Sequence, residues 1–182
     1  LDRTIQPQSE PLQFVLPEYE KIFLDNKMPC YIVSSGAEDV VKIEITFPAG
    51  ESYGLNPMVA IAANRMLEEG TKSRTSKQIA DDLDFYGAYL SLSAEKDYAS
   101  ITLYGLSEHL SNILPIFQDL VLHTIFPENE LAIYLNNSKQ NFMVNLEKVS
   151  VLSKRVFMEL TYGKEHPYGR NVLLEHYSET TQ

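Results

Sequence analysis

The sequence of 182 residues contains no tryptophan and only one cysteine, Cys30. A single cysteine excludes an internal disulfide and a cysteine-rich metal site, and the apolar residues around Cys30 predict that it lies in the core. Basic residues are also scarce, since 15 lysine and arginine side chains stand against 25 acidic ones, a formal net charge of −10. This balance argues against a nucleic-acid partner, because the phosphate backbone requires a basic surface.

Long apolar runs are missing as well, because no stretch approaches the roughly 18 residues of a membrane span. The first residues, LDRTIQPQSEP, lack the basic start and the apolar core of a signal peptide. We therefore expect a soluble protein without a membrane span. The sequence leaves open whether it is cytoplasmic or periplasmic.

Apolar residues alternate in some stretches and recur at helical spacing in others. The predicted strands are residues 19–24 and 30–35, which form a hairpin, and residues 40–47, 88–93 and 98–105. The predicted helices are residues 57–69, 75–87, 107–124, 127–146 and 149–162. This order predicts an α+β domain whose antiparallel or mixed sheet carries helices on one face. Residues 1–17, with three prolines, are expected to be an extended lead-in, and residues 18–182 a single domain.

Two packing expectations follow from these patterns. In residues 40–47 the apolar Val41, Ile43, Ile45 and Phe47 alternate with polar residues, which predicts a half-buried strand. The last helix is expected to bury four apolar side chains: Leu152, Val156, Phe157 and Leu160.

The residues that carry chemistry do not form a complete active site. Four histidines are present, His109, His123, His166 and His176, and no two of them have the spacing of metal ligands. The H-E-x-x-H metal motif, the G-x-S-x-G nucleophile turn and the G-x-x-x-x-G-K phosphate loop are all absent from the sequence. The residues by themselves therefore predict a fold but no complete active site.

One long stretch resembles a known family. The run GTKSRTSKQIADDLDFYGAYLSLSAEKDYASITLYGL, which begins at Gly70, resembles the N-terminal domain of the pitrilysin and insulinase zinc peptidases, which include the mitochondrial processing peptidase. The segments FPENEL (126–131) and HPYG (166–169) lie where that family has similar ones. The resemblance implies the α+β fold of that domain, within a longer subunit that contains two such domains.

Active members of this family carry H-x-x-E-H on the helix directly before M-L-x-x-G-T. The two histidines bind zinc from one helix face, and the glutamate is the general base that activates the metal-bound water. Here M-L-x-x-G-T is Met66 to Thr71, so the histidine positions hold Ile61 and Arg65 and the base position holds Asn64. None of these three side chains can play the family role, because isoleucine has no ligand atom, arginine is a permanent cation and asparagine takes no proton from water.

A further zinc-binding glutamate of the family is expected between residues 137 and 143, where NSKQNFM contains no carboxylate. Glu130 and Glu147 lie outside this window and do not restore a site that lacks its histidines. The resemblance therefore implies no catalytic residue, no metal ligand and no cofactor on this chain. Zinc is expected only in a catalytic partner.

The family also binds substrate along an edge strand through an Asn-Ala pair, and the matching residues here are Ser91 and Leu92. This departure puts peptide binding by that edge in doubt. For Arg65, a surface ion pair with Glu69 at i+4 is favoured over a binding role.

Three functions remain as expectations. The first is a non-catalytic subunit that pairs with a homologous H-x-x-E-H subunit and helps it to bind and process a peptide. The second is a structural scaffold with no role in proteolysis, and the third is an active zinc endopeptidase with a displaced site.

Overall fold

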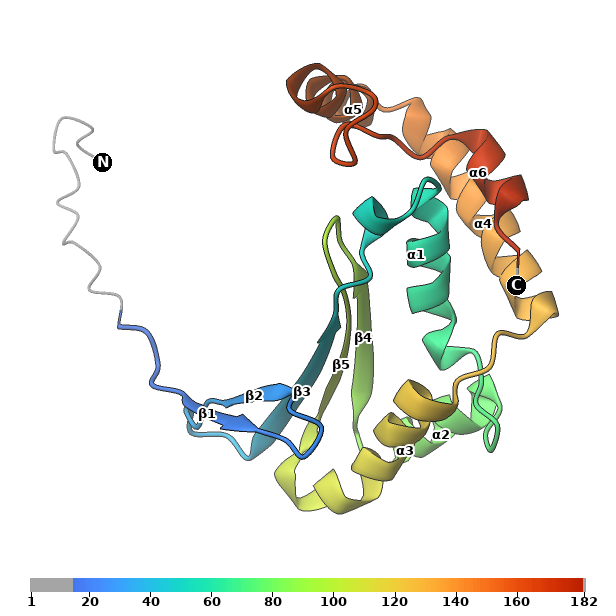
Figure 1. Ribbon diagram of the computed structural model, residues 1–182. Coiled ribbons are helices and arrows are strands. Elements are labelled where there is room, and N and C mark those ends of the chain that lie inside the picture. The colour runs from blue at the N-terminus through green and yellow to red at the C-terminus, as the bar shows by residue number, and fades with distance from the viewer. Residues whose placement is uncertain (1–14, 182) are drawn as a thin grey trace, which may run out of the picture. The chain divides into compact units, whose positions relative to one another are not determined.

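The computed structural model describes residues 15–181, and contacts divide the chain into two units, Leu1–Glu38 and Asp39–Gln182. The described part of the first unit is an antiparallel hairpin of β1 (Glu20–Phe23) and β2 (Pro29–Ile32) (Figure 1). The sequence predicted this hairpin. Cys30 in β2 is partly buried rather than enclosed in a core, because a two-stranded hairpin has no interior. Most of the predicted lead-in lies outside the described residues, and its boundary at residue 17 stays a prediction.

The second unit contains an antiparallel sheet of three strands: β3 (Val40–Phe47), β4 (Tyr89–Ala94) and β5 (Ala99–Leu106). Their order is β3–β5–β4, so β5 is central and Ile101 pairs with Ile45 on one side and Leu92 on the other. In β5 the polar Ser100 and Thr102 are as buried as their apolar neighbours. Alternation in sequence therefore does not reveal the central position of β5. In β3, at the edge, the predicted half-buried alternation is confirmed, since Val41, Ile43, Ile45 and Phe47 are partly buried and the residues between them are exposed.

Six α-helices complete the described part of this unit. They are α1 (Pro57–Arg65), α2 (Ser76–Phe85), α3 (Leu110–His123), α4 (Glu128–Leu146), α5 (Val149–Tyr162) and α6 (Leu174–Glu179). Short 3-10 turns lie at Glu51–Tyr53, Met66–Glu68 and Ser107–His109. Five of the six helices were predicted, whereas α6 lies in a stretch that was assigned no helix.

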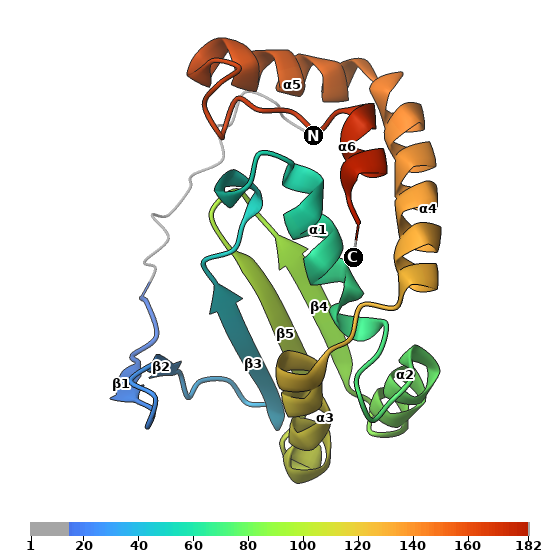
Figure 2. The same cartoon turned by 45° about the vertical axis from the view of Figure 1, so that its right-hand side comes forward.

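Helices α1, α2 and α3 lie on one side of the sheet (Figures 1 and 2). The main core contains Ile79 and Leu83 of α2, Ile113 and Phe117 of α3, and Ile101 of β5. The antiparallel sheet with helices on one face confirms the predicted α+β class.

A second apolar cluster joins α1 to the outer helices α4 and α6. Met58, Ala62 and Met66 of α1 are buried in it together with Leu131 of α4 and Tyr177 of α6. Burial of the Tyr177 ring raises the pKa of its hydroxyl. This cluster orients α1 so that one of its faces packs against α4, the helix on which residues 137–143 are the expected place of the family's further zinc-binding glutamate.

Helix α5 contradicts the sequence prediction. Leu152, Val156, Phe157 and Leu160 were expected to be buried, but between 43% and 81% of each is exposed. Helical periodicity identifies an apolar face without saying whether a neighbour covers it.

Helix α2 begins with a reciprocal cap that sets its first turn. The Thr75 hydroxyl accepts a bond from the Gln78 amide at 3.3 Å, and Gln78 Oε1 accepts one from the Thr75 amide at 2.9 Å. We expect Thr75→Ala to lower the free energy of unfolding by about 1 kcal/mol, because the Gln78 amide loses its acceptor. Urea denaturation measures this loss. Lys77→Ala, two residues further on and paired with Asp81 at the surface, is the control and should leave the free energy of unfolding nearly unchanged.

Candidate functional site

The family's zinc positions fall on α1, whose start is fixed by Asn56. The Asn56 Oδ1 atom accepts a hydrogen bond from the Met58 amide at 2.9 Å, and Pro57 fits the first turn because it has no N–H group that would need an acceptor. The Asn56 Nδ2 atom donates to the His176 carbonyl at 3.0 Å and to the Thr180 hydroxyl at 3.2 Å. One side chain thus caps α1 and attaches α6 beside it.

Ile61, at the first histidine position, faces the apolar cluster between α1 and α4. It packs against that cluster together with Tyr134, Leu135 and Phe142 of α4. Phe142 lies within the window where the family glutamate is expected. Carbon atoms therefore occupy the surroundings in which a zinc ligand would need an imidazole and a carboxylate.

Asn64, at the base position, holds α1 against the central strand. Its side chain is buried, and its Nδ2 atom donates to the Ser100 carbonyl of β5 at 3.1 Å. The amide is thus committed to a backbone acceptor 36 residues away in sequence. Sequence reasoning assigned no structural role to Asn64, because only the folded sheet brings Ser100 within reach.

Arg65, at the second histidine position, points toward acidic side chains of its own segment. It forms an ion pair with Glu68, and its Nη2 atom lies 3.8 Å from Glu69 Oε1. The side chain of Arg65 is 44% exposed, so these pairs lie at the surface. The predicted Arg65–Glu69 pair is present, and a permanent cation held here opposes a divalent metal ion.

The residues at the family site therefore do not fit zinc. Ile61 offers no donor atom, the Asn64 amide is used by the sheet, and Arg65 brings positive charge. Within residues 15–181, no group of three histidine, cysteine, aspartate or glutamate side chains is arranged to hold a metal ion.

Ser91 and Leu92, the expected substrate edge, lie on β4 at one edge of the described sheet. Leu92 packs against the main core, and Ser91 is exposed on the other face of the strand. A cavity of about 280 Å³ lies beside the start of this strand, lined by Tyr89 and Leu90 and by Arg65 of α1. The structure thus brings β4 close to the end of α1.

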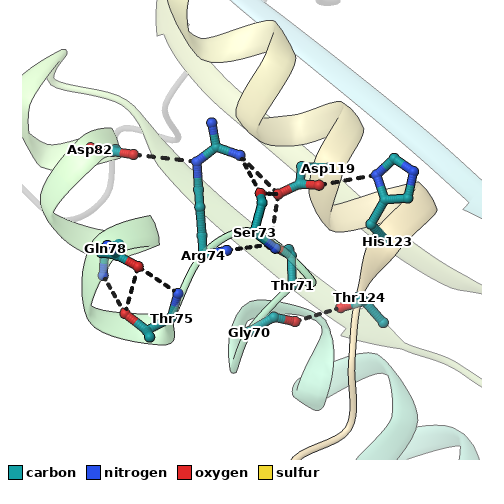
Figure 3. Close-up of polar contacts among 10 residues, drawn as sticks. All are labelled: Gly70, Thr71, Ser73, Arg74, Thr75, Gln78, Asp82, Asp119, His123 and Thr124. Carbon is teal, nitrogen blue, oxygen red and sulfur yellow. Dashed lines mark hydrogen bonds and ion pairs between the residues drawn. The ribbon is translucent and has the colours of Figure 1, made fainter.

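A polar cluster around Asp119, partly exposed at the surface, was missed by sequence reasoning (Figure 3). The hydroxyls of Thr71 and Ser73 each donate to Asp119 Oδ2 at 2.6 Å, and Arg74 Nη1 lies 2.8 Å from the same atom. His123 Nδ1 lies 3.0 Å from Asp119 Oδ1. The bonds from Ser73 and Thr71 lower the pKa of Asp119 most, and Arg74 and His123 lower it further.

This cluster locks the loop that follows the M-L-x-x-G-T motif onto α3. Arg74 also reaches Asp82 of α2 at 3.4 Å, and the Thr124 hydroxyl donates to the Gly70 carbonyl at 3.3 Å. The signal in the sequence was the polar run after Gly70, but its partner, Asp119, lies more than 40 residues later. The loop positions the end of α1 and is a structural device rather than a reactive centre.

Comparison with proteins of known sequence gives relatives named as zinc proteases. A Rickettsia felis protein named "Uncharacterized zinc protease" is 25% identical over 150 residues, which are 82% of this chain and 35% of that protein. The Bacillus subtilis "Uncharacterized zinc protease YmxG" is 25% identical over 108 residues, 59% of this chain and 26% of that protein. The chain thus spans about a third or less of these relatives. No protein-family model matches it.

Solved structures decide the fold. The peptidase M16 inactive domain from Pseudomonas fluorescens superimposes with a TM-score of 0.78 at 24% identity, over 88% of this chain and 42% of that one. The chain has the fold of an M16 peptidase domain. A protease from Helicobacter pylori matches this M16-type domain with a TM-score of 0.78 at 13% identity, over 92% of this chain and 41% of that one.

These findings confirm the resemblance of this M16-type domain to the pitrilysin and insulinase zinc peptidases. The periplasmic protease PqqL from Escherichia coli also matches, with a TM-score of 0.68 at 14% identity over the whole chain and 22% of that protein. None of the helices described in residues 15–181 has the length and hydropathy of a membrane span. The compartment stays a prediction.

Proposed function

We propose that this M16-type domain belongs to a non-catalytic subunit, which pairs with a homologous H-x-x-E-H subunit and helps it to hold a peptide for cleavage. The observation that carries the proposal is that all three family positions on α1 have non-catalytic contacts of their own. Ile61 packs in an apolar cluster, Asn64 bonds a strand carbonyl, and Arg65 pairs with glutamates. Such contacts are expected of positions that are retained for the fold after the chemistry is lost.

Peptide binding would use the free edge of β4. An edge strand presents backbone amides and carbonyls that an extended peptide can pair with, and neighbouring cavities then select its side chains. The cavity beside Tyr89 and Leu90 lies at this edge, next to Arg65. The strand edge and the cavity would allow the domain to bind a peptide, and neither supplies a group that would cleave it.

The test is capture of the full-length protein from its native lysate, followed by mass spectrometry and metal analysis. We expect a stoichiometric companion that carries H-x-x-E-H and binds zinc. The isolated protein should contain far less than one zinc per chain and should not hydrolyse peptides. The companion, analysed in parallel, is the positive control for zinc retention. One zinc per isolated chain would instead favour an active peptidase with a displaced site.

A structural scaffold is the second candidate function, and the two residues at the expected substrate positions of β4 favour it. Ser91 and Leu92 replace the Asn-Ala pair that the family uses for substrate, and an asparagine amide can bind a peptide backbone in ways that serine and leucine side chains cannot. Trapping of a peptide by the intact pair of subunits separates the two functions. A β4 edge that contacts the peptide supports the proposal, and a peptide held entirely by the companion supports the scaffold.

A further inference from the structure

The cavity beside the start of β4 has a wall with an excess of negative charge. It opens where the end of α1, helix α2 and β4 meet, and its volume is about 280 Å³. Three carboxylates and one guanidinium line it, so negative charges exceed positive ones by two. These side chains are Glu68, Glu69, Asp84 and Arg65. Such a wall attracts a positively charged ligand and repels an acidic one.

One arginine serves two of these carboxylates. Arg65 forms an ion pair with Glu68, and its Nη2 atom lies 3.8 Å from Glu69 Oε1. The hydroxyl of Ser76 donates to Glu69 Oε2 at 3.1 Å. Asp84 forms no ion pair within residues 15–181. Arg65 therefore leaves room on the wall for a second cation.

The floor of the cavity is apolar. Ile79 and Leu83 of α2 line it and belong to the main core, and Leu90 of β4 lines it and packs against that core. A matching ligand has a hydrocarbon part and a cationic end, as lysine and arginine side chains do. Pockets that enclose a whole small-molecule ligand have volumes of about 300–1,000 Å³. The smaller volume here suits one side chain of a larger ligand.

The position of the cavity identifies that larger ligand. Side chains of an extended peptide alternate between the two faces of a sheet that it joins. Leu90 faces the helices, since it packs against the main core. A peptide residue on the same face, beside Leu90 at the β4 edge, would therefore lie against the cavity.

We propose that this cavity binds a lysine or arginine side chain of the peptide held along the β4 edge. The inference rests on the peptide-binding role proposed above and adds the class of side chain that the domain selects. The methylene groups would cover Ile79 and Leu83, and the cationic end would lie beside the carboxylates. An acidic side chain would meet charges of its own sign, and an uncharged one would leave the carboxylates without a partner.

The first test compares three probe peptides on the natural full-length protein. Each is a fluorescein-labelled peptide of about ten alternating serine and alanine residues, with lysine, Nε-acetyllysine or glutamate at its centre. Fluorescence anisotropy should show the lysine peptide binding about three- to fivefold more tightly than the other two. Equal binding of the three peptides would overturn this inference and leave the peptide-binding role standing. If no peptide binds, both are wrong.

The second test shows whether the preference arises at this cavity. Asp84→Lys reverses a charge of the wall, and Asp81→Lys reverses one on the same helix that does not line the cavity. Both aspartates are exposed, and both replacements change the net charge equally. We expect the preference for lysine to disappear in Asp84→Lys and to persist in Asp81→Lys. The acetyllysine peptide should bind equally to all three proteins, which checks their folding.

Two results would contradict this location. Loss of the preference in both variants would show that a basic peptide responds to the overall charge of −10. Persistence of the preference in both variants would show that the lysine side chain binds elsewhere. Either result would overturn the inference.

Discussion

Replacing Asp119 by asparagine is expected to lower the free energy of unfolding by about 3 kcal/mol. The carboxylate is 12% exposed and accepts bonds from Thr71, Ser73 and Arg74, which all lose a charged acceptor in the variant. Equilibrium unfolding in urea at pH 7 measures the loss. The consequence reaches the family site, because this cluster holds the loop that follows α1.

Asp82→Asn is the matched control for this experiment. Asp82 pairs with the same Arg74 at 3.4 Å, but its side chain is 49% exposed, so its loss should cost no more than about 0.5 kcal/mol. Equal losses for the two variants would show that Asp119 contributes only as a surface charge, contrary to the several contacts drawn to it in Figure 3.

The same carboxylate gives the protein an acid-sensitive contribution to stability. Because folding lowers the pKa of Asp119, the folded state releases this proton more readily than the unfolded chain. The contribution is therefore complete above about pH 5 and is lost as the pH falls below about 4. The difference in unfolding free energy between the natural protein and Asp119→Asn should shrink over that range, and a constant difference would contradict this assignment.

The second large effect on stability is expected when a glutamate is placed at the family's base position. Asn64→Glu is expected to lower the free energy of unfolding by about 2–4 kcal/mol, because a buried carboxylate would replace the amide that donates to the Ser100 carbonyl. In an active enzyme a zinc ion lies near the glutamate at this position. Here Ile61 and Arg65 cannot bind zinc, so the new carboxylate would have no metal ion beside it.

Arg65→Gln, one residue further along α1, is the control and should change stability by no more than about 0.5 kcal/mol, since its ion pairs lie at the surface. The contrast is read by urea denaturation of both variants. If Asn64→Glu left the free energy of unfolding unchanged, the hydrogen bond to Ser100 would not be holding α1 in place. The structural role assigned to Asn64 would then be wrong.

Much of the fold follows from local pattern. The period of the apolar residues located the five strands and five of the six described helices, because alternation and helical spacing are properties of a short stretch of chain. The M-L-x-x-G-T motif supplied the register that places Ile61, Asn64 and Arg65 at the family positions. The prediction that this chain lacks the zinc ligands therefore comes from the sequence alone.

Tertiary structure alone decided how those positions are used. Asn64 meets Ser100, and Asp119 meets Thr71, across 36 and 48 residues of sequence, and no local pattern encodes such pairs. Likewise the apolar period of α5 was visible in the sequence, but its direction was set by the contacts of Arg155. Periodicity determines which residues share a face, and only packing of distant segments determines what that face meets.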